Sequence, residues 1–319
     1  MTSPLLAHAE RPRRVLVFAP ASVLMDEANS LTQYADQVMR GAIAAEYRPD
    51  CLIFDLEDSV SHSHKAKAAE MLSDFLEGCD RPDGVELVIR VNCCGSKHQR
   101  NRERELASQE IIDAIMIPKV QSGNYRHLLD EFSSLGKTLL PIIETTGAFN
   151  DRTRILQAIK REGSRFGDSG AAVLGLDDLA SDLRIARDMF FEDAAYRSML
   201  GLFVSSVRQA GLAAIGPVYN IARDPNGAGG EARQLSRLGF HGCLCVFPPY
   251  VRQIKAAFTP TVAAEQRAAT IRAELESAGR NGYGWVIHNG IKYDLADLPY
   301  LEWLIMHAAA CRELDSRSV

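Results

Sequence analysis

The most constraining feature of this chain is a set of eight short apolar segments. They occupy residues 14–19, 51–56, 86–91, 114–118, 138–143, 171–174, 212–215 and 242–247, and most are rich in Val, Ile and Leu. Near-continuous apolar runs of this length are typical of strands buried on both faces of a parallel sheet. Their starts lie roughly 25–40 residues apart, which leaves room for a helix between successive strands.

The segments between these runs have the periodicity of helices. Apolar side chains recur at helical spacing in residues 26–46, 64–76, 124–135, 152–160, 178–209 and 231–238. Strand–helix alternation repeated eight times predicts an α/β fold of the (β/α)8 TIM-barrel type. A doubly wound open sheet is the main competitor, but the GxGxxG motif that often follows its first strand is missing here.

The chain is longer than a barrel requires. Of its 319 residues, 13–258 suffice for the eight strand–helix units and the expected metal site. Residues 259–319 contain two further helical patterns around a glycine-rich stretch, and we expect them to form a C-terminal helical extension, or lid. Residues 1–12 lack the apolar stretch of a secretory signal, and we expect a disordered lead-in there.

Charge and hydropathy exclude two classes of partner. The formal net charge is −5, so the chain offers no basic field for nucleic acid. No apolar run approaches the roughly 18–20 residues that span a bilayer, so we expect no membrane partner. Seven cysteines without a CxxC pair favour reduced thiols, and hence a cytoplasmic protein.

Polar side chains follow most of the predicted strands. Barrels of this class place the active site at the C-terminal ends of their strands, so these side chains should meet at one rim. They are Glu57, Asp58, Arg90, Asn92, Lys119, Glu144, Asp177 and Asp178. Taken alone, an acidic residue such as Asp58 or Asp177 is as typical of a helix N-cap as of an active site.

Carboxylates gathered at one rim repel one another unless a cation neutralises them. The donors expected here are oxygens, without His or Cys at matching positions, which favours Mg2+ before Mn2+ or Ca2+. The sequence therefore predicts a Mg2+-dependent enzyme, with Mn2+ as a substitute, that acts on an oxygen-rich anionic small molecule. Arg90 would hold a carboxylate or a developing enolate oxygen.

Five motifs then follow one another in a familiar order. They are DCLIFDLEDSV at 50–60, IRVN at 89–92, IPKV at 117–120, PIIETTG at 141–147 and GLDDLASDL at 175–183. Together with NGIKYD at 289–294, they resemble the citrate lyase beta subunit family of the HpcH/HpaI aldolase/citrate lyase superfamily, which includes malyl-CoA and citramalyl-CoA lyases. The resemblance implies a Mg2+-dependent barrel that cleaves or forms a carbon–carbon bond beside a thioester.

The resemblance also assigns roles to single residues. Glu144 and Asp178 match the two metal-binding carboxylates, and Arg90 matches the arginine that binds the carbonyl oxygens of the substrate. Glu57 and Asp58 match acidic positions near the metal that act through water.

The resemblance extends to the assembly. The relatives are usually trimers or hexamers in which a C-terminal loop enters the neighbouring active site, which implies a homotrimer or hexamer for this chain. Asp294 matches the proton-transferring carboxylate of that loop. Seven further residues are candidates for contact with substrate or coenzyme A: Arg14, Pro20, Lys65, Asn92, Lys119, Gly175 and Asp177.

The implied reaction cleaves a 3-hydroxy-3-carboxyacyl-CoA thioester of the citryl-, malyl- or citramalyl-CoA type into acetyl-CoA and a 2-keto acid. Three other functions stay open on the sequence: a malyl-CoA-type thioesterase on the same scaffold, a CoA-independent class II aldolase, and a non-catalytic subunit of a lyase complex. Asp294 argues against the aldolase, and the retained metal-site residues argue against the non-catalytic subunit.

Overall fold

The computed structural model describes residues 11–21, 48–78, 82–92, 96–163 and 170–317. Eight parallel strands follow one another around a closed barrel, and β1 pairs with both β2 and β8. The strands are β1 (Val15–Pro20), β2 (Cys51–Asp55), β3 (Glu86–Arg90), β4 (Ala114–Ile117), β5 (Thr138–Ile143), β6 (Ala171–Leu174), β7 (Ala213–Tyr219) and β8 (Gly242–Cys245). This confirms the predicted (β/α)8 barrel.

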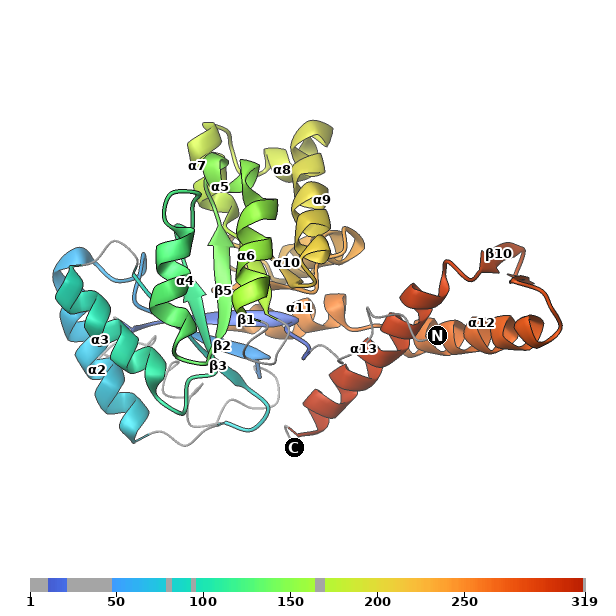
Figure 1. The fold of residues 1–319 in the computed structure, drawn as a ribbon, viewed down its shortest axis with the longest axis horizontal. Coiled ribbons are helices and arrows are strands. Elements are labelled where there is room, and N and C mark those ends of the chain that lie inside the picture. Colours follow the sequence, from blue (N-terminus) through green and yellow to red (C-terminus); the bar gives the residue numbers. More distant parts are fainter. Residues whose placement is uncertain (1–10, 22–47, 79–81, 93–95, 164–169, 318–319) are drawn as a thin grey trace. The chain divides into compact units, whose positions relative to one another are not determined.

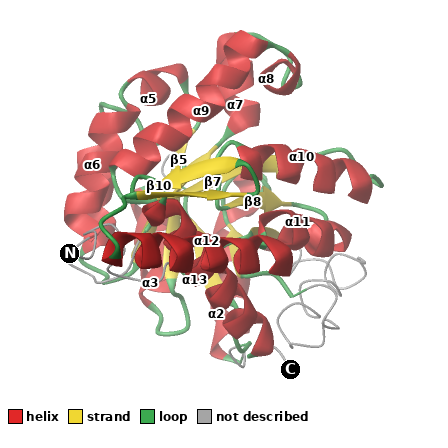
Figure 2. Cartoon of the chain, turned by 90° about the vertical axis from the view of Figure 1, so that its right-hand side faces the viewer, coloured by secondary structure: helices red, strands yellow, loops and turns green. Residues whose placement is uncertain are grey.

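Helices lie outside the strands of the barrel (Figures 1 and 2). They are η4 (His62–His64), α2 (Lys65–Glu77), α3 (Lys97–Ser108), α4 (Tyr125–Ser133), α5 (Thr146–Asn150), α6 (Arg152–Gly163), α7 (Leu176–Leu183), α8 (Met189–Glu192), α9 (Ala194–Gln209), α10 (Pro225–Arg237), η5 (Pro248–Tyr250) and α11 (Val251–Phe258). The predicted helix at 26–46 lies outside the described residues.

The segment 178–209, predicted as one helix, contains two breaks. Arg184 adopts a left-handed conformation, with φ of 59°, and this ends α7. The side chain of Asp193 then accepts hydrogen bonds from the first backbone N–H groups of α9 and so starts a new helix. Apolar periodicity continues across both breaks, which is why the sequence pattern did not reveal them.

Side chains along each strand alternate between two apolar layers. Leu16, Ile53 and Val88 belong to the cluster built from strand residues that fills the barrel interior. Their neighbours Val17 and Leu52 belong to the larger cluster between the strands and the surrounding helices. All five are fully buried. Strands covered on both faces explain the near-continuous apolar runs in the sequence.

Ion pairs close the end of the barrel at which the strands begin. Arg13 donates two hydrogen bonds to Glu86, and Arg14 donates two of 2.9 Å from its guanidinium to Asp50. Lys255 Nζ lies 3.1 Å from the same Asp50 carboxylate. The prediction that Arg14 binds coenzyme A is therefore wrong: its side chain is fully buried, paired, and at the end opposite the C-terminal strand ends.

The chain divides into two compact units at Phe258 and Thr259. The C-terminal unit contains α12 (Val262–Arg280), a hairpin of β9 (Trp285–His288) and β10 (Ile291–Asp294), and α13 (Leu298–Ser316). Asn289 and Gly290 both have positive φ and form the two-residue turn of the hairpin. The hairpin replaces part of the stretch that the sequence marked only as glycine-rich.

A small apolar core joins the two helices of this unit. Ala268, Ile271 and Leu275 of α12 pack with Leu301 and Leu304 of α13. Among the helices of the described residues, none combines the length and the apolar character that crossing a membrane requires.

Candidate active site

The C-terminal ends of neighbouring strands bring charged side chains to one mouth of the barrel. Asp55 and Arg90 are the last residues of β2 and β3, and strand register places them side by side. Lys119 follows β4, Glu144 follows β5 directly, and Asp178 lies in the first turn of α7 after β6. Parallel strands share one direction, so residues distant in sequence converge here.

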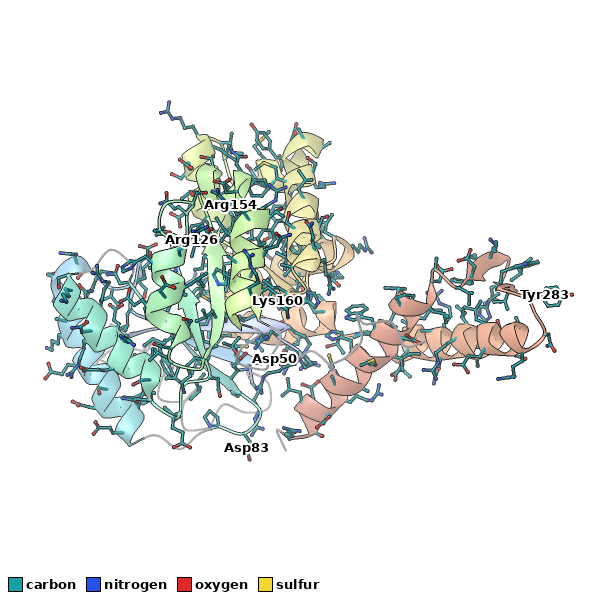
Figure 3. The ribbon with its side chains drawn as sticks, in the orientation of Figure 1. Asp50, Asp83, Arg126, Arg154, Lys160 and Tyr283 are labelled. Carbon is teal, nitrogen blue, oxygen red and sulfur yellow. The ribbon has the colours of Figure 1, made fainter. Side chains whose placement is uncertain are left out.

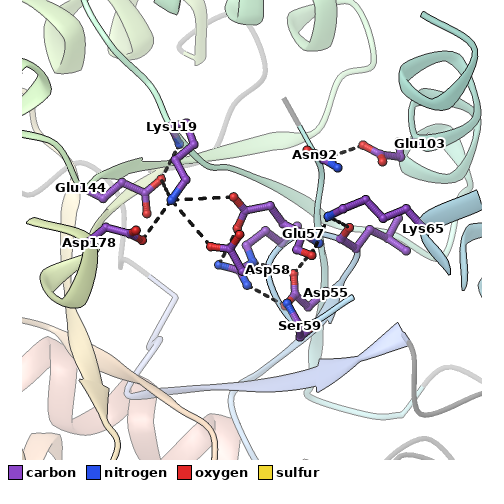
Figure 4. Close-up of polar contacts among 12 residues, drawn as sticks. Asp55, Glu57, Asp58, Ser59, Lys65, Asn92, Glu103, Lys119, Glu144 and Asp178 are labelled. Atoms are coloured by element: carbon purple, nitrogen blue, oxygen red, sulfur yellow. Dashed lines mark hydrogen bonds and ion pairs between the residues drawn. The ribbon is translucent and has the colours of Figure 1, made fainter. Parts of the chain in front are cut away.

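Four carboxylates surround the ammonium group of Lys119 (Figure 4). Its Nζ atom lies 3.0 Å from Asp178 Oδ2, 3.7 Å from Glu144 Oε1, 3.7 Å from Asp58 Oδ2 and 3.9 Å from Glu57 Oε1. The carboxylates come from three separate segments of the chain. These acidic residues were predicted to meet at one rim, whereas Lys119 was predicted to contact the substrate and not to be the cation among them.

The backbone around Lys119 is held in an unusual conformation. Lys119 has φ of 52°, its N–H donates a 2.5 Å hydrogen bond to Glu144 Oε1, and its carbonyl accepts one from Asn124 Nδ2. The Glu144 side chain in turn passes directly over Gly175. A β-carbon at Gly175 would lie 2.5 Å from Glu144 Cβ, so this position requires glycine. Gly175 thus leaves the space that the Glu144 side chain occupies.

Asp55, which was not among the predicted site residues, holds the side chain of Arg90 in place. Arg90 Nε and Nη2 each donate a 2.6 Å hydrogen bond to the Asp55 carboxylate. Arg90 Nη1 lies 3.0 Å from Glu57 Oε2, and the Phe18 ring lies beneath the guanidinium at 4.7 Å. Asp55 also accepts hydrogen bonds from the N–H groups of Glu57 and Ser59. It therefore positions both Arg90 and the loop that carries Glu57.

The carboxyl groups of this mouth have different proton affinities. Burial raises the pKa of Glu57 to about 7, although Arg90 opposes the shift. Burial likewise raises the pKa of Glu144 to about 7, against the hydrogen bond from the Lys119 N–H. Burial acts in the same direction on Asp55, but the hydrogen bonds from Arg90 outweigh it and lower the pKa of Asp55. The mouth thus combines a fixed anion with two groups that titrate near neutrality.

Asp177 and Asp178 are adjacent in sequence but take part in different contacts. Asp178 reaches the Lys119 ammonium, whereas Asp177 accepts a 3.0 Å hydrogen bond from Asn220 and lies 3.4 Å from Arg187 Nε. Arg187 is also paired with Glu231 at 2.6 Å. Asp178, not Asp177, therefore shares a cation position with Glu144.

Two further candidates, Lys65 and Asn92, take part in hydrogen bonds within the loops of the mouth. Lys65 Nζ donates to the backbone carbonyl of Glu57 at 2.7 Å. The Asn92 N–H donates to Glu103 at 2.6 Å, and Pro20 is the last residue of β1. Lys65 and Glu103 thus hold the backbones of two loops that line the mouth.

Asp294 belongs to the C-terminal unit, where it ends β10. Its carboxylate accepts a hydrogen bond from the Ala296 N–H at 2.9 Å and one from Lys292 Nζ at 3.2 Å. These two donors lower the pKa of Asp294. The side chain is partly exposed and carries a negative charge at neutral pH.

The mouth that carries Glu57, Asp58, Glu144 and Asp178, here called the acidic mouth, can hold a hard cation, although it does not enclose a metal ion on all sides. In the described part of the chain, no three His, Cys, Asp or Glu side chains are grouped as metal ligands. Glu144 and Asp178 nevertheless present carboxylate oxygens to a single cation, the Lys119 ammonium. Mg2+ is commonly held by one or two carboxylates, with water and substrate oxygens completing its shell. This pair of residues fits that arrangement.

Two named proteins are similar to this chain over most of its length. The chain is 29% identical over 289 residues to (3S)-malyl-CoA thioesterase of Cereibacter sphaeroides, covering 89% of this chain and 90% of that protein. It is 25% identical over 289 residues to citrate lyase subunit beta of Leuconostoc mesenteroides, covering 89% of each.

A solved structure with the same fold is that of CitE from Mycobacterium tuberculosis in complex with magnesium, acetoacetate and coenzyme A. The two structures superpose with a TM-score of 0.68 at 21% sequence identity, covering 94% of this chain and 99% of that one. The HpcH/HpaI aldolase/citrate lyase family matches residues 35–248. This range contains β2 to β8 and the residues that follow them at the acidic mouth. The chain belongs to the HpcH/HpaI aldolase/citrate lyase family.

Proposed function

We propose that this protein is a Mg2+-dependent carbon–carbon lyase that cleaves a 3-hydroxy-3-carboxyacyl-CoA thioester into acetyl-CoA and a 2-keto acid. The proposal rests on one observation: Glu144 and Asp178 both lie close to the Lys119 ammonium, beside the Arg90 guanidinium that Asp55 holds in place. Family membership supports it, because the family contains lyases that act on such thioesters.

Glu144 and Asp178 would hold the metal, with Mn2+ as a substitute for Mg2+. Bound there, the ion would polarise the substrate's hydroxyl and carboxylate oxygens and neutralise the charge of the keto acid that forms. Arg90 would stabilise the developing oxyanion, because Asp55 and Phe18 hold its guanidinium in one orientation.

Cleavage requires two proton transfers. The hydroxyl proton must leave as the carbon–carbon bond breaks, and the carbon of the resulting thioester enolate must gain a proton. Glu57 is suited to accept the first, because its pKa is about 7. Asp58 would act beside it through water, and Asp294 would carry the second proton, as the resemblance to the family implies. Lys119, Asn92, Asp177, Lys65 and Pro20 would line the substrate and coenzyme pocket.

Asp294 would act in a neighbouring subunit of a homotrimer or hexamer. The hairpin that carries it exposes Trp285, Ile287 and Ile291, with exposed fractions of 47%, 63% and 54%. Tyr283, which precedes the hairpin, projects from the C-terminal unit and is 61% exposed (Figure 3). Exposed apolar side chains gathered in one short segment favour a protein partner, and a second copy of this chain fits the proposal.

A substrate panel tests the reaction. Citryl-, malyl-, citramalyl- and methylmalyl-CoA are offered to the purified protein with Mg2+ and with EDTA. We expect keto-acid release from at least one thioester with Mg2+, and its loss in EDTA. Asp294→Asn is expected to bind the metal normally and to lose turnover. Keto-acid release that persists undiminished in EDTA would exclude the metal-dependent mechanism.

A thioesterase is the second candidate, because the (3S)-malyl-CoA thioesterase relative matches nearly the whole chain. The same panel separates the two activities: the lyase releases a free keto acid and acetyl-CoA, whereas the thioesterase releases free malate and coenzyme A. A protein that acts on none of these thioesters would support a non-catalytic subunit of a lyase complex.

The buried thiols of Cys51, Cys243, Cys245 and Cys311 support a cytoplasmic location.

Metal affinity is expected to depend on pH. Glu144 must be ionised to bind a cation, and its pKa is about 7, so Mg2+ should bind about tenfold more weakly at pH 6 than at pH 8. Isothermal titration calorimetry at the two pH values measures this. Equal affinity at both would contradict the assignment of Glu144 as a ligand.

The stability of the metal-free protein should change in the opposite sense. The folded-state pKa values of Glu57 and Glu144, about 7, exceed the ordinary value of 4.5. Both carboxyls therefore contribute stability that is complete below pH 4.5 and is lost as the pH rises through 7. Melting curves in EDTA across this range measure the loss.

A further inference from the structure

The Lys119 ammonium lies close to the position at which the proposed metal ion would bind. A cation already lies beside the two proposed metal ligands, at 3.0 Å from Asp178 Oδ2 and 3.7 Å from Glu144 Oε1. Mg2+ binds carboxylate oxygens at about 2.0–2.1 Å. An ion held by these two side chains would therefore lie within a few ångströms of the ammonium, and two cations so close repel each other strongly.

We propose that Lys119 is an internal counter-ion of the metal site: its ammonium occupies the cation position in the metal-free protein, and Mg2+ must displace it to bind. The inference rests on the proposed function, because it takes Glu144 and Asp178 as the metal ligands. It adds that Lys119 competes with the metal for these carboxylates and so sets the affinity of the site for the metal.

The surroundings of Lys119 allow the ammonium to move while its backbone stays in place. The backbone is held by hydrogen bonds to Glu144 and Asn124, whereas the side chain is a flexible stem that is 26% exposed. Asp58 and Glu57 lie 3.7 and 3.9 Å from Nζ, and they belong to a different loop from the proposed ligands. The ammonium therefore has a second pair of carboxylates toward which it can shift.

Charge balance explains why a cation is built into the site. Four carboxylates within 4 Å of one point would repel one another in the metal-free protein. Arg90 does not relieve this repulsion fully, because two of its guanidinium nitrogens are engaged by Asp55. The Lys119 ammonium supplies the missing charge at the cost of weaker metal binding.

Metal titration of charge-removing variants tests the proposal. Lys119→Met removes the charge and keeps an unbranched apolar stem, whereas Lys119→Arg keeps the charge. Lys97→Met, at an exposed position at the start of α3, is the matched control. Binding of Mn2+ is followed by the electron paramagnetic resonance signal of the free ion, and binding of Mg2+ by calorimetry. Thermal melting is recorded in EDTA and in excess Mg2+.

We expect Lys119→Met to bind both ions at least about tenfold more tightly than the wild type, because a neighbouring positive charge has been removed. Its melting temperature should fall in EDTA and recover with Mg2+. Lys119→Arg and Lys97→Met should bind metal within about threefold of the wild type. If Lys119→Met does not fold, Lys119→Gln decides the question by the same measurements.

Unchanged or weaker metal binding by Lys119→Met would overturn the proposal. If Glu144→Gln abolishes wild-type binding while Lys119→Met leaves it unchanged, only the counter-ion role fails and the proposed function stands. If neither the wild type nor any variant binds metal, the proposed function fails and the counter-ion role fails with it. Binding that appears only in Lys119→Met would support the proposal.

Discussion

Replacing Glu144 by glutamine is expected to abolish Mg2+-dependent release of a 2-keto acid, lowering kcat by about a thousandfold or more. Glutamine has nearly the same shape, so it still fits over Gly175 and still presents an oxygen to the Lys119 N–H. It removes the negative charge that the proposed metal site needs. Steady-state assays on the thioester substrate, with Mg2+ in excess, measure the effect.

Glu70→Gln, on an exposed position of α2, is the matched control and should keep wild-type activity. The melting temperature of Glu144→Gln in EDTA should stay close to that of the wild type or rise, because a buried carboxyl that is costly to ionise has been removed. If Glu144→Gln retained full Mg2+-dependent cleavage, the metal site would have to lie elsewhere.

The second large effect is expected from Asp55→Asn. Asp55 is 1% exposed and holds Arg90 through two hydrogen bonds of 2.6 Å. Removing one partner of a buried ion pair leaves the other charge uncompensated, and such changes cost about 3 kcal/mol or more. Chemical denaturation should therefore show a loss of stability of about this size, and kcat/KM should fall at least about a hundredfold because Arg90 loses its orientation.

A double-mutant cycle separates the role of Asp55 as a partner of Arg90 from a general effect on folding. In an Arg90→Gln background, Asp55→Asn should cost much less stability and almost no further activity, because the interaction is already lost. Full, additive losses in that background would mean that Asp55 does not act through Arg90.

The barrel was predictable because its signal is local and repeated. Each strand is buried on both faces, so each appears in the sequence as a short apolar run, and the runs recur with helical segments between them. The breaks at Arg184 and Asp193 and the turn at Asn289 and Gly290 were not predicted. They depend on the local conformation of single residues. The apolar pattern continues through the helix breaks, and in the hairpin it is too short to indicate a strand.

The candidate site was predictable to the extent that it follows from strand direction. Glu57, Arg90, Glu144 and Asp178 lie at or just beyond the C-terminal ends of β2, β3, β5 and β6, and parallel strands bring these ends to one mouth. The same rule shows why Arg14 was wrong. It precedes β1, so strand direction assigns it to the opposite end, where it is buried against Asp50.

The sequence by itself determined the architecture, the family and most of the acidic residues that meet at the mouth, because these follow from apolar periodicity and from motifs in a fixed order. Only the tertiary structure decided how those residues are paired. Asp55 engages Arg90, Asp177 turns to Arg187, and Lys119 occupies the centre of four carboxylates. Such pairings depend on distances between side chains from different strands, and no pattern along one strand contains that information.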